Sequence, residues 1–129
     1  MTAYLFLIHA RGVGLPLGIA AICPELEVCT LRWRSCDGVT LPTLATSREW
    51  AAVERWLDRV PDGAVVPRTS ALARKILGAV LGALLLDITR FASLDICVPP
   101  TASEWGHLLS EQLERASARA PDNASRALQ

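Results

Sequence analysis

The chain has 129 residues, of which 51% are hydrophobic and 20% are charged, and its acidic and basic residues balance to a formal net charge of zero. This length fits one domain, and this composition indicates a chain that folds rather than one that stays disordered. Zero net charge argues against strong nonspecific binding to polyanions, although it is compatible with a local basic patch.

The cysteines lack the C-x-x-C spacing of zinc sites, and no secretory signal precedes them. The four are Cys23, Cys29, Cys36 and Cys97. We therefore expect reduced thiols in a cytoplasmic protein. The apolar run 76–86 is much shorter than the roughly 20 residues needed to cross a membrane, so we expect a soluble chain without membrane contact.

Three strands are predicted at the start of the chain. Residues 4–10 are almost wholly apolar, which is typical of a strand covered on both faces. Residues 17–23 follow a break rich in glycine and proline, and residues 26–34 alternate between two faces. The short connections predict an antiparallel meander, followed by a loop at 35–45.

Helices and further strands are predicted in the rest of the chain. A Thr-x-x-Glu capping box at 46–49 starts a first helix, and residues 64–67 form a brief strand. Thr69 or Ser70 caps a second helix that is apolar on most sides. Residues 93–98 read as the last strand, and a second capping box at 101–104 starts the third helix. We expect one domain over 1–116 and a flexible tail over 117–129.

The resulting order is βββαβαβα, an α/β arrangement in which a three-stranded antiparallel meander continues through crossover strands into a mixed sheet flanked by helices. This is the order of the RNase H-like fold. Three stretches also resemble RuvC-type Holliday-junction resolvases: Leu7-Ile8-His9-Ala10 followed by Leu17-Gly18-Ile19-Ala20, the small-residue pattern of 69–84, and the passage 94–105. The resemblance covers about half of the chain and implies a homodimer that acts on nucleic acid.

The chain departs from the resolvases at the positions that matter for catalysis. In that family, carboxylates at the ends of the first and fourth strands and on the last helix hold two divalent metal ions. Here His9 stands at the first position, and Pro67 and Arg68 stand at the second. Imidazole is a poor ligand for magnesium, so we expect no metal, no cofactor and a pseudo-nuclease rather than an enzyme.

An alternative keeps catalysis by a rearranged site. His9 is the first candidate residue, and the last helix supplies Glu104, His107 and Glu111. Imidazole with carboxylate can bind manganese or zinc, so these residues would serve a divergent metal-dependent endonuclease with manganese or magnesium as its cofactor. The competing interpretation is that the three helix residues are ordinary surface side chains. Asp87 and Asp95 could be taken as a pair of catalytic carboxylates, but the sequence places no partner for either, so we interpret both as structural residues.

Arginines supply almost all of the positive charge and are the candidates for contacts to phosphates. The set is Arg11, Arg32, Arg34, Arg68 and Arg74. Because acids are as numerous as bases, a solvated surface of mixed charge is the competing interpretation.

A dimer interface is predicted on the helices. Trp56 lies off the apolar stripe of the first helix, which favours an exposed interface residue. The second helix has more apolar surface than one sheet covers, and its small-residue face includes Gly78, Leu81 and Gly82. Close packing of this helix on the sheet is the simpler alternative.

Three functions follow as hypotheses. The first is a noncatalytic, RuvC-like homodimeric factor that associates with structured DNA or RNA, or with a protein partner. The second is the divergent nuclease that uses His9. The third is a protein-interaction or inhibitor module with no nucleic-acid role.

Overall fold

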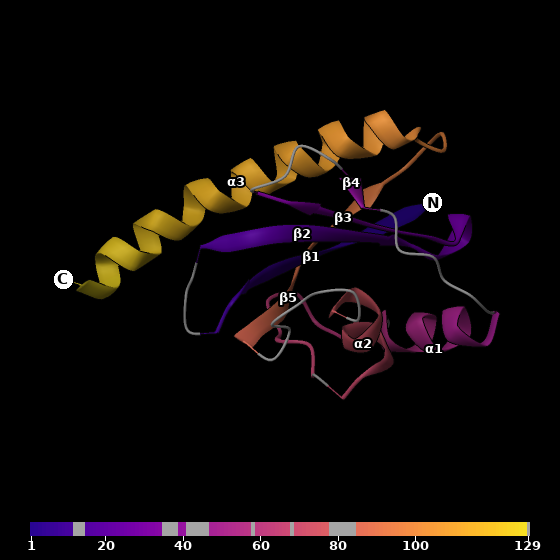
Figure 1. Ribbon diagram of the computed structural model, residues 1–129, viewed down its shortest axis with the longest axis horizontal. Coiled ribbons are helices and arrows are strands. Elements are labelled where there is room, and N and C mark those ends of the chain that lie inside the picture. The colour runs from indigo at the N-terminus through magenta and orange to yellow at the C-terminus, as the bar shows by residue number, and fades with distance from the viewer. Residues whose placement is uncertain are drawn as a thin grey trace.

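The computed structural model describes residues 1–11, 15–34, 39–40, 47–57, 59–67, 69–77 and 85–128. In these residues a β-sheet lies between two helical layers (Figure 1). The long helix α3 (Ala102–Leu128) covers one face, whereas α1 (Ser47–Leu57) and α2 (Ala71–Leu77) cover the other. The α/β class predicted from the sequence is therefore confirmed.

Among the described residues, the sheet has five strands in the order β4-β3-β2-β1-β5. The strands are β1 (Thr2–Ala10), β2 (Pro16–Cys23), β3 (Val28–Trp33), β4 (Val39–Thr40) and β5 (Leu86–Asp95). A short 3-10 helix, Pro24–Leu26, turns the chain between β2 and β3. The first three strands form the antiparallel meander that the sequence predicts.

Alternation along the central strand β1 divides the core in two. Phe6 and Ile8 are buried towards α1 and α2, where Leu57 and Leu72 pack against them. Ala3 and Leu5 are buried towards α3, together with its Trp105, Leu109 and Leu113. A strand that is buried on both faces has a nearly continuous apolar sequence, and for this reason β1 could be predicted from the sequence.

Gly18 allows a close approach within the meander. A Cβ atom at this position would lie 2.7 Å from Cε3 of Trp33 and 3.0 Å from the carbonyl oxygen of Arg32. The Trp33 ring therefore lies across the backbone of Gly18, where no side chain fits. This glycine therefore has a local packing role.

The second half of the sheet differs from the predicted order. Residues 64–67 contribute only an isolated bridge between Val65 and Thr89, and not a strand. The last strand begins at Leu86 and not at residue 93, and it pairs antiparallel with β1. Every strand pairing among the described residues is antiparallel, so the mixed sheet with crossover strands was wrong.

The physical reason for this difference is the direction in which the chain enters β5. Leu86 pairs with Ala10, so the chain begins β5 at the end of the sheet where β1 finishes. A parallel neighbour would have to begin beside the start of β1. The RNase H-like order βββαβαβα is consequently not reproduced by the described strands.

Helix termini follow the predicted caps where the structure describes them. Ser70 Oγ accepts a hydrogen bond from the Ala73 N–H at 3.1 Å, so Ser70 rather than Thr69 caps α2. Thr101 Oγ1 accepts from the Glu104 N–H at 3.2 Å and donates to Glu104 Oε1 at 3.1 Å, which adds a side-chain bond to the predicted cap. The backbone of α3 is helical to Leu128, beyond the helix end predicted at residue 116.

Two further features concern the cysteines and the membrane. Cys23 and Cys29 are buried free thiols and Cys97 is an exposed one, whereas Cys36 lies outside the described residues. Among the described helices, none has the length and apolar character required to cross a membrane.

Candidate functional site: a groove between β3 and α3

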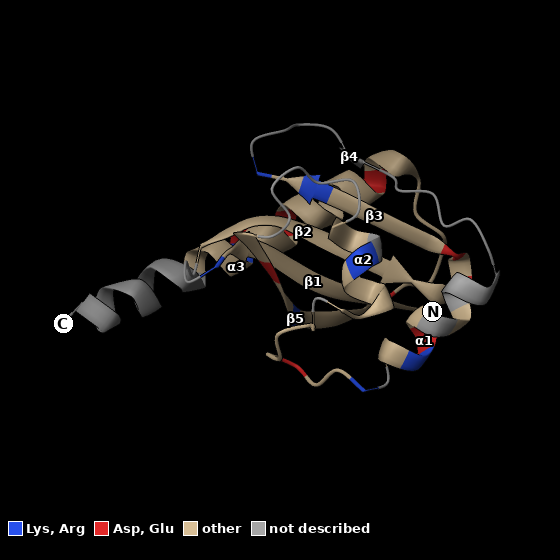
Figure 2. Ribbon diagram, turned by 60° about the horizontal axis from the view of Figure 1, so that its bottom comes forward, with Lys and Arg blue, Asp and Glu red and all other residues tan. Residues whose placement is uncertain are grey.

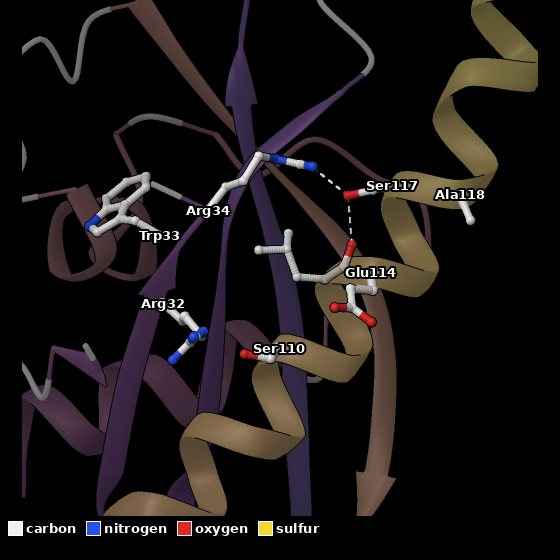
Figure 3. Close-up of a pocket in the computed structure, with 8 residues that line it drawn as sticks. Arg32, Trp33, Arg34, Ser110, Glu114, Ser117 and Ala118 are labelled. Carbon is white, nitrogen blue, oxygen red and sulfur yellow. Dashed lines mark hydrogen bonds between the residues drawn. The ribbon is translucent and has the colours of Figure 1, made fainter. Parts of the chain in front are cut away.

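An open groove of about 510 Å³ lies between strand β3 and helix α3. We call it the α3–β3 groove. Its lining includes two arginines from the end of β3, two serines of α3, and one glutamate of α3: Arg32, Arg34, Ser110, Ser117 and Glu114 (Figure 3). Leu113 and Ala118 complete the helix wall, and Trp33 belongs to the strand wall.

Alternation along β3 explains why both arginines reach this groove. Arg32 lies opposite Ile19, which is buried in the core beneath α3. Residues two apart on a strand share a face, so Arg34 follows Arg32 to the α3 side. Trp33 turns to the other face, where it packs against the core beneath α1 and α2.

Arg34 fastens α3 to the sheet. Its Nε and Nη2 donate to the carbonyl oxygen of Pro16 at 3.0 and 2.6 Å, and Nη2 also donates to Ser117 Oγ. Ser117 Oγ in turn donates to the carbonyl oxygen of Leu113 at 2.7 Å. These bonds join the start of β2, the end of β3 and the part of α3 around Ser117, and they fix one end of the groove.

None of these partners of Arg34 is a carboxylate. Two neutral oxygens receive its hydrogen bonds, so its positive charge is not neutralised by them. A guanidinium has five N–H donors in a planar fork, which suits it to carboxylate and phosphate groups. Arg34 therefore gives the groove a fixed positive charge.

Arg32 and the serines supply the rest of the polar lining. The half-buried Arg32 extends between β3 and α3 towards the hydroxyl of Ser110 (Figure 3). It also takes part in a further interaction, and a guanidinium carries five N–H donors. The exposed Glu114 places one negative charge on the helix side. The groove thus combines two guanidiniums with two hydroxyls and a single carboxylate.

The predicted histidine and carboxylate cluster is not assembled. His9 is half-buried at the end of β1, opposite Asp87 of β5, and its Nδ1 lies 3.3 Å from the carbonyl oxygen of Ala10. Glu104 belongs to the cap of α3, and Glu111 pairs with Arg115 at 2.8 Å.

His107 is exposed on the same helix. Among the described residues, no contact joins His9 to Glu104, His107 or Glu111, whose side chains are all exposed on α3. In the part of the chain that the structure describes, no group of three or more His, Cys, Asp or Glu side chains is placed to hold a metal ion.

The five predicted phosphate-binding arginines do not share one surface. Only Arg32 and Arg34 line the groove. Arg11 lies beyond the end of β1, 3.9 Å from Asp87, and the exposed Arg74 lies on α2 across the sheet from α3. Basic segments at the end of β3 and on α2 appear as separate places in Figure 2. Arg68 lies outside the described residues.

The predicted dimer interface has a mixed outcome. Trp56 is half-buried and packs against the core beneath α1, so its interpretation as an exposed residue was wrong. The remaining three residues, Gly78, Leu81 and Gly82, lie outside the described residues.

The sequence reasoning missed the helix side of the groove. Ser110, Glu114 and Ser117 recur at spacings of four and three residues, which places them along one side of a helix. That spacing was a usable signal for a polar stripe. Nothing local to α3, however, indicates that this stripe lies beside the end of β3.

The chain was compared with known protein families, curated proteins and solved structures. No family model, no curated protein and no solved structure matches the chain.

Proposed function

We propose that the chain is a binding protein that acts in nucleic-acid transactions without catalysing a reaction, and that its α3–β3 groove receives backbone phosphates. The observation that carries the proposal is the convergence of Arg32 and Arg34 with the hydroxyls of Ser110 and Ser117 in one open groove. Guanidiniums and hydroxyls are among the side-chain groups that contact phosphate oxygens.

The arrangement favours phosphates over base edges. Arg34 is held by three hydrogen bonds, so its charge is fixed in place before a ligand arrives. A preorganised donor loses little conformational entropy on binding. Contacts of this kind position a nucleic acid without reading its sequence, so we expect a preference for shape rather than for base composition.

The affinity should be modest. Two phosphate contacts on duplex DNA correspond to a slope of about −1.8 for log K against log salt, which is a loss of about tenfold between 50 and 200 mM salt. The zero net charge adds no long-range attraction. Binding should therefore be clearest at low salt.

We take from the resemblance to RuvC-type resolvases only the class of partner, because the antiparallel sheet gives the resolvase order no support. The nuclease alternative has no supporting contact among the described residues, since Glu104 bonds to the cap residue Thr101 and Glu111 pairs with Arg115.

Fluorescence anisotropy with labelled branched, duplex and single-stranded DNA tests the proposal. Arg32→Gln should weaken binding by about tenfold, because a charge-assisted contact to phosphate contributes about 1.5 kcal/mol. Arg74→Gln is the matched control, since it removes the same charge from an exposed position across the sheet.

Two results would overturn the proposal. One is the absence of binding to any of these DNAs, and to their RNA counterparts, at low salt. The other is an equal loss in both variants, which would mean that the groove has no special role. Cleavage of the same substrates with manganese or magnesium, abolished by His9→Ala, would favour the nuclease instead.

A further inference from the structure

Arg34 keeps unused hydrogen-bond donors in the α3–β3 groove. Its hydrogen bonds use Nε and Nη2, whereas Nη1 has no bond to any of the described residues. The residue is exposed, so the two N–H groups of Nη1 are accessible to a ligand. Because Nη2 bonds both to Pro16 of the sheet and to Ser117 of α3, the guanidinium lies at the floor of the groove, between the sheet and the helix (Figure 3).

Arg32 precedes Arg34 by two residues and lines the same groove. A strand rises about 3.3 Å per residue, so the Cα atoms of these two arginines are about 6.7 Å apart. Consecutive phosphates of an extended polynucleotide have a similar separation. The groove therefore presents one guanidinium to each of two successive phosphates.

The outer surface of α3 is unfavourable for a nucleic-acid duplex. Over residues 102–117, the helix exposes three glutamates against one arginine: Glu104, Glu111, Glu114 and Arg115. Double-stranded DNA carries about one negative charge per 1.7 Å along its axis. A duplex that reached Arg34 across α3 would therefore bring further phosphates next to these carboxylates, and like charges in a contact repel each other.

The shape of the groove also favours a flexible strand. The helix α3 forms one wall, which rises above the sheet beside the two arginines (Figure 1). A DNA duplex has a persistence length of about 50 nm, so it does not bend around one helix to bring two consecutive phosphates to the floor beside it. A single strand lacks this stiffness and can follow the floor along β3.

The lining of the groove is suited to a sugar–phosphate backbone rather than to stacked bases. Among the described lining residues, only Trp33 is aromatic. Its ring lies against Gly18, and the side chain packs against the core beneath α1 and α2. Proteins that bind single strands through their bases stack them on accessible aromatic rings. The polar groups that face the groove are instead guanidiniums and hydroxyls, which contact phosphates.

We infer that the α3–β3 groove holds the backbone of a single-stranded nucleic acid, with two consecutive phosphates on Arg32 and Arg34 and with the bases turned outward. The inference rests on the proposed phosphate-binding function, and it adds the strandedness and the orientation of the ligand. The two guanidiniums supply the affinity, whereas the wall formed by α3 and its exposed glutamates selects the single strand.

Competition between a short DNA single strand and the duplex formed with its complement tests the strandedness, with the full chain at low salt and anisotropy as the readout. The single strand should bind at least about fivefold more tightly, and Arg32→Gln should remove most of this affinity whereas Arg74→Gln keeps it. Duplex binding that depends on Arg32 and is as tight as single-strand binding would overturn the inference and leave the proposed function intact. Absence of binding to both forms, as DNA and as RNA, would overturn the two together.

Partial neutralisation of the backbone tests the placement of two consecutive phosphates. Two oligonucleotides carry the same number of uncharged methylphosphonate groups, either in one block, which leaves adjacent charges, or in alternation, which leaves none adjacent. The oligonucleotide with adjacent charges should bind about fivefold more tightly, and Arg32→Gln should abolish this difference because one arginine then remains. Equal affinity of the parent chain for the two oligonucleotides would contradict the placement.

Removal of bases tests the outward orientation. A single strand with abasic sites in place of its central nucleotides keeps every phosphate, so its affinity should change by less than about twofold. A larger loss would show that the protein holds the bases, and it would overturn the orientation inferred from the lining of the groove. Circular dichroism of Arg32→Gln and Arg74→Gln confirms that both variants are folded in these measurements.

Discussion

The two faces of the sheet are covered by helices in different ways. On one face, α1 and α2 cover β1, β2 and β3 with a large apolar cluster, and the charged Arg90 is sealed at its border. On the other face, the single helix α3 packs chiefly on β2 and β3, and a polar groove opens along its contact with β3. Two short helices close a face, whereas one long helix leaves strand side chains accessible beside it.

The largest expected effect comes from shortening neighbouring core residues that point to opposite faces. Phe6→Ala and Leu5→Ala should each lower the free energy of unfolding, by about 3–5 and 2–5 kcal/mol respectively, because both side chains are fully buried. Denaturant unfolding measures both. A loss below about 1 kcal/mol for Leu5→Ala would mean that α3 adds little to the core.

Gly18→Ala should be next in size. The added methyl group would stand 2.7 Å from the Trp33 ring, so we expect a loss of about 1–3 kcal/mol in unfolding free energy. Thermal unfolding measures it, and Trp33→Leu in the same chain should recover part of the loss. A double variant whose effects simply add would show that the two residues do not compete for space.

Arg34→Gln should loosen α3 without unfolding the sheet. It removes the charged donor from Pro16 and Ser117, which should cost about 1–3 kcal/mol. Hydrogen exchange should show faster exchange in α3 near Ser117 and unchanged protection in β1. Ser117→Ala should have a milder effect. Equal protection of α3 in the parent chain and in Arg34→Gln would show that Arg34 does not hold α3 on the sheet.

Glu114→Gln should have the smallest effect and the opposite sign. It removes the negative charge that the helix contributes to the groove, so DNA affinity should rise by about two- to threefold at low salt. The exposed Glu111 pairs with Arg115 on α3 and serves as the control position. A larger gain from Glu111→Gln than from Glu114→Gln would indicate that DNA binds elsewhere on the helix.

The same contrast between faces explains what the sequence could predict. The strands β1, β2 and β3 and the caps at Ser70 and Thr101 depend on local patterns, and local patterns found them. The start of β5 was missed because the apolar run before Asp87 continues a helical pattern, and short apolar runs fit either structure. Its antiparallel pairing with β1 is a nonlocal choice that no local pattern encodes.

The groove was half predictable for a related reason. Alternation over residues 26–34 implies that Arg32 and Arg34 share one face of β3, and both line the groove. Their meeting with Ser110 and Ser117 depends on how α3 crosses the sheet, which is set by packing between residues far apart in the chain. His9 drew attention through its place in a motif, whereas the structure sets it opposite Asp87 within the sheet.

The salt dependence of DNA binding by Arg32→Gln and Arg74→Gln tests the central claim most directly. If Arg32 contacts a phosphate, its replacement should reduce the slope of log K against log salt by about one, and Arg74→Gln should leave the slope unchanged. The same slope for the parent chain and Arg32→Gln would contradict a phosphate-binding groove between β3 and α3.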